Sequence, residues 1–383
     1  MQENYLILND TITLSTNISS SKANTITYEI MHMEKIVATI STVGRVILHN
    51  EKFLPYDLYF ETLEDIDTLL NNLNSFYSWC ASRVLSLDRK YAKEILNSIG
   101  VAQAVTDKER ASISLSYHCV SLTDVYWVRK QGEAVTFENI NLYDKSLNEA
   151  IVEISLKGHQ MTVTNRELAH DLATRGCFPK AWIRQGNTFK LLKDGGDDAV
   201  KKELLASKIC QCFDIPQVKY SAGNYDGQMV SQSDIITSKE YSMVSKMAFE
   251  IYASNHDLDM FAEFERIDLR TFYGMNILDY LTGNTDRHPE NWGLLVDNRT
   301  NEYISLYPLM DFNKCFLAYD NIEGANCLTV LPKKMTQREA AIEAVKKIGL
   351  PQIKEMDMSA FEDMKEEAEM FQLRLNELRQ IVM

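Results

Sequence analysis

Three polar side chains in the second half of the chain have the types and the spacing that phosphate chemistry requires. Asp286 and Asn291 are five residues apart, and Asp311 follows twenty residues later, directly before Phe312. Phosphoryl transfer needs a carboxylate at the attacking hydroxyl and oxygen ligands for Mg²⁺, because position and charge stabilise its transition state. Mg²⁺ prefers carboxylate and carbonyl oxygens. The pattern therefore predicts a magnesium-dependent phosphotransfer site.

The segments that contain these residues resemble a known family. Residues 283–295 read GNTDRHPENWGLL, and residues 310–312 read MDF. Together they are similar to the catalytic and metal-binding loops of the HipA-like kinases, relatives of protein kinases. The Asp-Arg-His-x-x-Asn order also resembles the loop of phosphoinositide lipid kinases. The resemblance covers roughly residues 176–375, and residues 1 to about 110 match no family in this way.

Carried over position by position, the resemblance assigns a role to each polar residue of these loops. Asp286 matches the catalytic base, and Asn291 and Asp311 match the magnesium ligands. His288 follows the base by two residues and is either an aid to proton movement and phosphate charge or a structural side chain. Asn313 stands where many kinases have Gly, a departure that we do not interpret as inactivation.

The resemblance also implies an ATP-binding lysine at the end of a strand and a glutamate on the next helix that holds it. Leu191 and Leu192 precede Lys193, which fits the lysine, and Glu203 is the helix residue that would pair with it. Lys190 on the same strand is the alternative. We favour Lys193 because it follows the apolar pair directly.

Two further nucleotide contacts are expected from order along the chain. Val230, Ser231 and Gln232 are expected to form the hinge that binds the adenine edge. Gly186 lies in a turn that could cover the phosphates, although a single glycine is a weak signal and a plain hairpin explains it as well. Gly195–Gly196 is a second candidate, or a flexible loop that leads into a helix.

Hydrophobic periodicity predicts the elements that position these residues. After Pro179 we expect a small sheet with one packed helix, followed by a mainly helical region. The expected small-lobe strands cover 181–184, 188–193, 217–220 and 227–231, with a helix over 199–213. The expected helices of the second lobe cover 240–253, 269–281, 337–348 and 358 to the end.

The first part of the chain shows a different pattern. Alternating β-branched and polar residues predict strands over 11–15 and 36–48, and a period of three to four residues predicts a helix from 63 to about 85. A short helix over 90–99 is expected to end at Gly100. Strands are expected over 112–117 and 125–129.

These elements predict an α+β, bilobal, protein-kinase-like fold preceded by an N-terminal α/β region. The expected divisions are an N-terminal region over 1–110, a connecting α/β segment over 111–178, a small sheet-plus-helix lobe over 179–238 and a larger helical lobe over 239–383.

Composition excludes several classes of protein. The 383 residues include 54 acidic and 40 basic side chains, for a net charge of −14, and 45% are hydrophobic. This balance is typical of a globular protein and argues against direct nucleic-acid binding. We expect a cytoplasmic protein without membrane contact, since no secretory or membrane-spanning segment is apparent. The seven scattered cysteines are expected to be mostly core residues.

The predicted function is that of an ATP- and Mg²⁺-dependent phosphotransferase of the HipA-like group. From the resemblance, the expected acceptor is Ser or Thr of a protein, including the chain itself, and a regulatory protein could bind the N-terminal region. The alternatives are a lipid or small-molecule kinase, an AMP transferase, a nucleotide-binding scaffold without turnover, or a regulatory protein of the toxin–antitoxin type.

Overall fold

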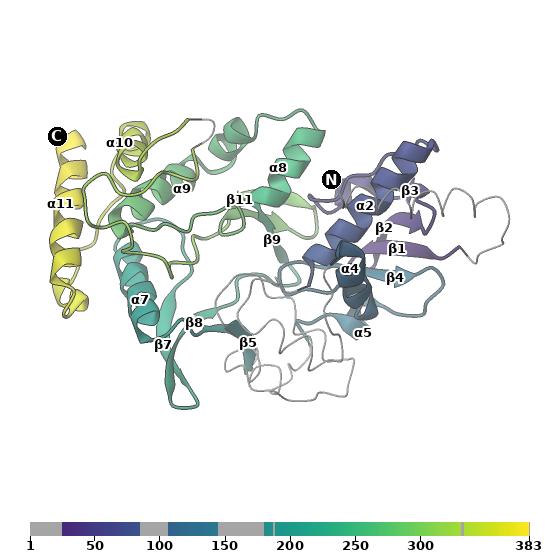
Figure 1. The fold of residues 1–383 in the computed structure, drawn as a ribbon, viewed down its shortest axis with the longest axis horizontal. Helices are drawn as coiled ribbons and strands as arrows, with labels where there is room; N and C mark the ends of the chain where they lie inside the picture. Colours follow the sequence, from purple (N-terminus) through teal and green to yellow (C-terminus); the bar gives the residue numbers. More distant parts are fainter. Residues whose placement is uncertain (1–24, 85–105, 145–179, 187, 331–332, 383) are drawn as a thin grey trace.

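Three antiparallel sheets follow one another along the described part of the chain (Figure 1). The computed structural model describes residues 25–84, 106–144, 180–186, 188–330 and 333–382. The expected strand at 11–15, the expected helix at 90–99 and Cys177 lie outside these ranges. The mixture of antiparallel sheets and helices confirms the predicted α+β class.

The N-terminal sheet has the strand order β3-β2-β1-β4. Aliphatic residues from its strands pack against aromatic residues of α2. Figure 1 shows this unit at one end of the molecule, with α10 and α11 at the other. Its elements are β1 (Thr27–His32), β2 (Lys35–Ser41), β3 (Val46–Leu48), η1 (Glu51–Phe53), α2 (Ile66–Ser82), α4 (Asp107–Ser116), β4 (Tyr126–Lys130) and α5 (Phe137–Ile140). Strand β4, which the sequence places in the connecting segment, pairs with β1 in this sheet.

The expected strand at 112–117 is wrong, because these residues lie mostly in helix α4. Thr106 and Glu109 form a capping box, in which each side chain bonds the backbone N–H of the other residue. This motif satisfies two backbone donors that a helix start otherwise leaves unpaired. A capping box is a local sequence signal for the start of a helix.

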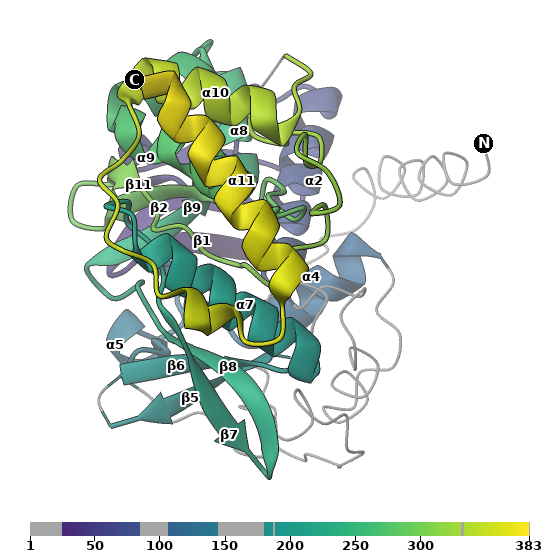
Figure 2. The same cartoon turned by 90° about the vertical axis from the view of Figure 1, so that its left-hand side faces the viewer.

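The second sheet has the order β5-β6-β8-β7, and helix α7 packs against β7 and β8 (Figure 2). The elements are β5 (Lys180–Gln185), β6 (Thr188–Lys193), α7 (Asp197–Gln211), β7 (Tyr220–Tyr225) and β8 (Gln228–Asp234). The expected strand at 217–220 is displaced, since β7 begins only at Tyr220. Residues before it instead pair with the segment that leads to Asp311, and Val218 N donates to Leu309 O over 2.8 Å.

The third sheet, β11-β10-β9, and five helices form the C-terminal half. Helix α10 packs along α9, and α11 crosses both (Figure 2). The elements are β9 (Tyr241–Ser245), α8 (Lys246–Asn255), α9 (Met260–Thr282), β10 (Gly293–Asp297), β11 (Glu302–Leu306), α10 (Gln337–Ile348), η3 (Met358–Phe361) and α11 (Lys365–Val382). Helix α9 ends at Gly283, whose φ of 57° is left-handed and favours glycine.

The expected helix at 240–253 is wrong in its first third. Residues 241–245 form β9, which pairs antiparallel with β10 and places Val244 opposite Leu294. Ser245 then caps α8 by accepting a hydrogen bond from Ala248 N. Strand pairing with a distant segment decides the conformation here, and local periodicity carries no information about it. The expected single helix from 358 to the end is likewise divided into η3 and α11.

Four cysteines are fully buried in the hydrophobic clusters, as expected for small core residues: Cys80, Cys119, Cys210 and Cys315. Among the helices of the described ranges, none combines the length and the apolar character needed to cross a membrane.

His32 on β1 is buried without a hydrogen-bond partner for either ring nitrogen among the described residues. The rings of Phe53 and Tyr126 lie 5.1 and 5.0 Å away. Burial, assisted by the charge of Lys35, lowers the pKa of His32 to about 4. The folded state therefore resists the proton that the unfolded chain accepts at a higher pH.

We expect the protein to lose stability as the pH falls from about 6.5 towards 4, by an amount on the order of 3 kcal/mol from His32 alone. Urea denaturation of the wild type and of His32→Leu at several pH values measures this effect. The free energy of unfolding should fall less steeply in His32→Leu. Equal slopes in the two proteins would contradict the assignment.

Candidate active site

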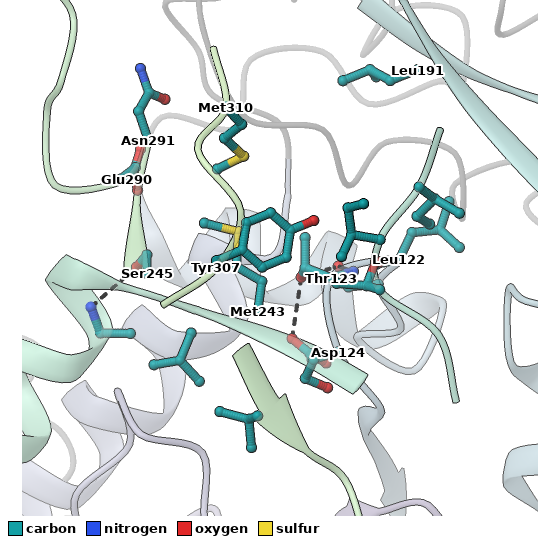
Figure 3. Close-up of a pocket in the computed structure, with 18 of the residues that line it drawn as sticks. Leu122, Thr123, Asp124, Leu191, Met243, Ser245, Glu290, Asn291, Tyr307 and Met310 are labelled. Atoms are coloured by element: carbon teal, nitrogen blue, oxygen red, sulfur yellow. Dashed lines mark hydrogen bonds between the residues drawn. The ribbon is translucent and has the colours of Figure 1, made fainter. Parts of the chain in front are cut away.

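A cavity of about 220 Å³ lies where the small lobe meets the C-terminal half. Leu191 of β6 lies above it, and Met243, Tyr307 and Met310 form the opposite wall (Figure 3). Asn291 lies with Glu290 at one end (Figure 3), and Lys193 and Asp311 also line this space. Mostly apolar walls with a few polar groups at one end are typical of small-molecule sites.

Lys193 is the last residue of β6 and is buried. Its Nζ lies 2.8 Å from Glu203 Oε1 and 2.8 Å from Asp311 Oδ1. Glu203 projects from α7 and accepts a second hydrogen bond from the Ser231 hydroxyl. Helix α7 and strand β6 thus bring the lysine and the glutamate of the sequence prediction together, and Asp311 joins them from the other lobe.

The charges of this cluster stabilise one another. Burial by itself lowers the pKa of Lys193, but Asp311 and Glu203 raise it well above its usual value. Burial likewise raises the pKa of Asp311, and the charges of Lys193 and Lys180 outweigh it and bring that pKa to about 2. Asp311 is therefore ionised at neutral pH, as a metal ligand must be.

Lys190, the alternative lysine, lies elsewhere. It lies opposite Asp234 of β8, with 3.9 Å between Lys190 Nζ and Asp234 Oδ1, and it does not line the cavity. Side chains alternate between the faces of a strand, so Leu191 and Lys193 share one face and Lys190 lies on the other. The geometry favours Lys193.

The backbone at Asp311 has an unusual conformation. Its φ is 60°, which is uncommon for a residue other than glycine and recurs at functional sites. Asp311 N donates to the Tyr220 hydroxyl over 3.1 Å. Tyr220 is itself tied to α7, since its N–H donates to Ser207 Oγ. The small lobe therefore helps to fix the carboxylate of the other lobe.

The loop between α9 and β10 carries Asp286, Asn291 and His288. Asn291 Nδ2 donates to Asp286 O over 2.7 Å, and Asn284 Oδ1 accepts from Asp286 N over 3.0 Å. His288 lines the cavity, and its Nδ1 accepts from Glu290 N over 3.2 Å. Asp286 does not line the cavity itself but lies beside Asn291 at its polar end.

Arg287 connects the two loops and was not singled out from the sequence. Its guanidinium forms a buried, two-pronged ion pair with Asp279 of α9, with Nε to Oδ2 at 3.0 Å and Nη2 to Oδ1 at 2.9 Å. Nη1 donates to Asn291 O over 3.0 Å and to Met310 O over 2.6 Å. The signal for this role was Asp279 itself, because a carboxylate inside an apolar helix needs a charged partner.

The oxygen atoms at the polar end fit a magnesium ion. Asn291 Nδ2 is engaged with the backbone of Asp286, which turns the side-chain oxygen of Asn291 away from that bond. The carboxylate of Asp311 together with the amide oxygen of Asn291 suits Mg²⁺, which takes its remaining ligands from phosphates and water. Two residues after Asp311, Asn313 Oδ1 is buried and accepts no hydrogen bond from the described residues, but Asn313 does not line the cavity.

The residues of the expected hinge, Val230, Ser231 and Gln232, lie inside β8 between β6 and β7, and none of them lines the cavity. Val230 belongs to the core of the small sheet, and Ser231 bonds Glu203. The cavity is lined instead by 235–237, just after β8. Order along the chain predicted a connection here, but it could not give the length of the strand.

Gly186 lies in the turn between β5 and β6 with φ 64° and does not line the cavity. Gly196, of the alternative glycine pair, occupies the position before α7 with φ 83°. The hydrogen bonds given above for Lys193, Glu203 and Asp311 involve neither glycine.

The N-terminal unit also contributes to the cavity wall, which the sequence did not suggest. Leu122, Thr123 and Asp124 lie opposite Asn291 (Figure 3). Thr123 O accepts from Met243 N of β9 over 2.9 Å. Asp124 forms a two-pronged ion pair with Arg83 at 2.7 and 2.9 Å. The ion pair fixes Asp124 within the N-terminal unit, and the hydrogen bond from Met243 N attaches this unit directly to β9, the strand that carries Met243 in the cavity wall.

Comparison with known proteins identifies the fold. The chain is similar to HipA in the complex of the Shewanella oneidensis MR-1 toxin–antitoxin proteins HipA and HipB with operator DNA. The TM-score is 0.52 at 11% identity, over 92% of this chain and 91% of that one. This similarity shows a HipA-like fold, in agreement with the fold that the sequence predicts.

A second similar structure is the Helicobacter pylori proinflammatory kinase CtkA, with a TM-score of 0.39 and 16% identity, over 52% of this chain and 90% of that one. No protein-family model matches the sequence, and neither does any curated protein.

Proposed function

We propose that this chain is an ATP- and Mg²⁺-dependent kinase that transfers phosphate to Ser or Thr of a protein, including itself. The observation that carries this proposal is the cluster of Lys193, Glu203 and Asp311, which closes across the two lobes within 2.8 Å contacts. Asn291 lines the polar end of the same cavity, and Asp286 lies beside Asn291. Phosphoryl transfer uses this set of charges.

In this proposal each side chain has a separate task. Lys193 binds the α- and β-phosphates, and Glu203 fixes its flexible stem. Asp311 and Asn291 hold the metal ion, which when bound neutralises charge on the phosphates. Asp286 accepts the proton of the acceptor hydroxyl and orients that hydroxyl towards the γ-phosphate. His288, at the cavity edge, either assists this proton movement or holds the loop through Glu290 N.

Incubation of the purified protein with labelled ATP and Mg²⁺, followed by mass spectrometry, tests the proposal. Phosphate on a Ser or Thr side chain supports it. Addition of AMP, or transfer only to a lipid or small molecule, would replace the proposed acceptor by one of the alternatives. Nucleotide binding without any product would identify a scaffold.

The role of Asp311 has its own test. Mg²⁺ with ATP should raise the melting temperature of the wild type, since ligand binding to the folded state stabilises it. Asp311→Asn keeps a hydrogen-bond acceptor for Lys193. In this variant, the melting temperature with ATP should differ little between samples with Mg²⁺ and samples with chelator. Asp214→Asn changes a surface carboxylate paired with Arg270 and should keep that difference. An unchanged difference in Asp311→Asn would remove it from the metal site.

A protein partner for the N-terminal region stays a prediction. The similar HipA structure is a complex with HipB and operator DNA. The net charge of −14 supports the view that any DNA contact of this chain is made through such a partner.

A further inference from the structure

Lys314 is a cation of the candidate site to which no role has been assigned. It follows Asp311 by three residues, and its Nζ lies 2.8 Å from Asp286 Oδ1. Its backbone carbonyl accepts hydrogen bonds from Thr285 N over 3.2 Å and from Thr285 Oγ1 over 3.3 Å. Both the side chain and the backbone of Lys314 are therefore tied to the loop that carries the proposed base.

Its position lies between the two groups that define the reaction path. The proposed metal ligand Asp311 precedes Lys314 in the chain, and the proposed base contacts its ammonium group. The transferred phosphoryl group must pass between the metal ion and the acceptor hydroxyl. Lys314 belongs to the segment that carries Asp311 and contacts Asp286. It is therefore adjacent to that path.

Two buried cations near the site, Lys193 and Arg287, are held by protein partners. Lys193 is enclosed by Glu203 and Asp311, and its side chain is 6% exposed. The Arg287 side chain is 2% exposed and is directed to Asp279 and to backbone carbonyls. The Lys314 side chain is 37% exposed. An ammonium group has three donors, so the contact of Lys314 with Asp286 is compatible with a hydrogen bond to a phosphate oxygen.

Lys180 lines the cavity, as do Arg83 and Lys193. It lies on β5 directly opposite Lys193 in the strand register, so it is on the small-lobe side, where the α- and β-phosphates are placed. Lys314 instead belongs to the segment that contacts Asp286. The two lysines therefore serve different parts of the nucleotide.

We propose that Lys314 is a further catalytic residue, which binds the γ-phosphoryl group and holds Asp286 against the acceptor hydroxyl. This inference rests on the proposed function. In the transfer step the acceptor oxygen forms a bond to the γ-phosphorus, and the bond from that phosphorus to the β–γ bridging oxygen breaks. The hydroxyl proton passes to Asp286, and ADP leaves with the bonding electron pair. Lys314 compensates the charge on the phosphoryl oxygens throughout.

ATP and ADP differ only in the group that Lys314 is proposed to bind, so a comparison of their affinities provides the test. Calorimetric titration of the full chain with each nucleotide and Mg²⁺ gives both dissociation constants. In Lys314→Met we expect ATP binding to weaken about tenfold to a hundredfold, the range for a lost charge-assisted hydrogen bond. ADP binding should change less than about twofold. Lys314→Arg should restore most of the preference for ATP.

Two controls make the result decisive. Lys333→Met removes an exposed lysine paired with Glu343 and should leave both affinities unchanged. The melting temperature without nucleotide monitors folding, and Lys314→Gln serves if the Met variant does not fold. Equal losses for ATP and ADP, or no loss, in the variant would overturn the role of Lys314 alone. A wild type that binds neither nucleotide would overturn this inference together with the proposed function.

Discussion

Replacing Asp286 by Asn should lower the rate of phosphotransfer by about 10²- to 10⁴-fold, the usual contribution of a positioned proton acceptor. The amide keeps the size of the carboxylate but cannot take the hydroxyl proton. The Mg²⁺-dependent stabilisation by ATP should be nearly unchanged, because Asp286 does not line the nucleotide cavity. Initial rates with labelled ATP and melting temperatures with ATP and Mg²⁺ measure the two effects.

Two outcomes would contradict this assignment. Loss of nucleotide binding along with activity would make Asp286 a metal ligand or a structural residue. Full activity in the variant would transfer the role of base to His288 or to water. Asp214→Asn, on the surface, is the matched control and should retain both properties, since its partner Arg270 is exposed.

The site residues that could be predicted from the sequence each belong to a short segment with a recognisable local pattern. Asp286 and Asn291 lie in one loop, and the hydrogen bond from Asn291 Nδ2 to Asp286 O is made within it. Lys193 was preferred to Lys190 because it follows the apolar pair Leu191–Leu192 directly, and Lys190 instead pairs with Asp234. A local pattern is sufficient where the neighbours in space are also neighbours in sequence.

The parts that were missed depend on contacts between distant segments. Lys314 reaches Asp286 across 28 residues, and Thr123 O meets Met243 N across the cavity wall. Neither residue has a local pattern that indicates its partner. The length of β8 depends on distant contacts as well, because its pairing with both β6 and β7 extends that strand to Asp234, beyond the residues predicted as a hinge.

The errors in the predicted secondary structure can also be divided into those that depend on distant contacts and those that a local pattern could have prevented. Strand β9 depends on its pairing with β10, some 50 residues later, and no local pattern announces it. Helix α4 is different, since its capping box at Thr106 and Glu109 is local and could have been recognised. Weighing caps before periodicity would have corrected that element from the sequence alone.

Replacing Arg287 by Met should lower the free energy of unfolding by about 3–5 kcal/mol, because it leaves the Asp279 carboxylate buried without its charged partner. Asp279 is 5% exposed and Arg287 2%. The same change removes the donor that bonds Asn291 O and Met310 O. Urea denaturation measures the loss of stability, and a loss below about 1 kcal/mol would contradict the buried ion pair.

A double variant separates the stability effect from the positioning effect. In Arg287→Met with Asp279→Leu no buried charge remains, so part of the lost stability should return, as is found when both partners of a buried ion pair become apolar. The carbonyls of Asn291 and Met310 still lack their donor. Phosphotransfer should therefore stay low although folding recovers. If activity recovered in parallel with stability, Arg287 would serve the fold alone and would not hold the metal-binding and catalytic loops in register.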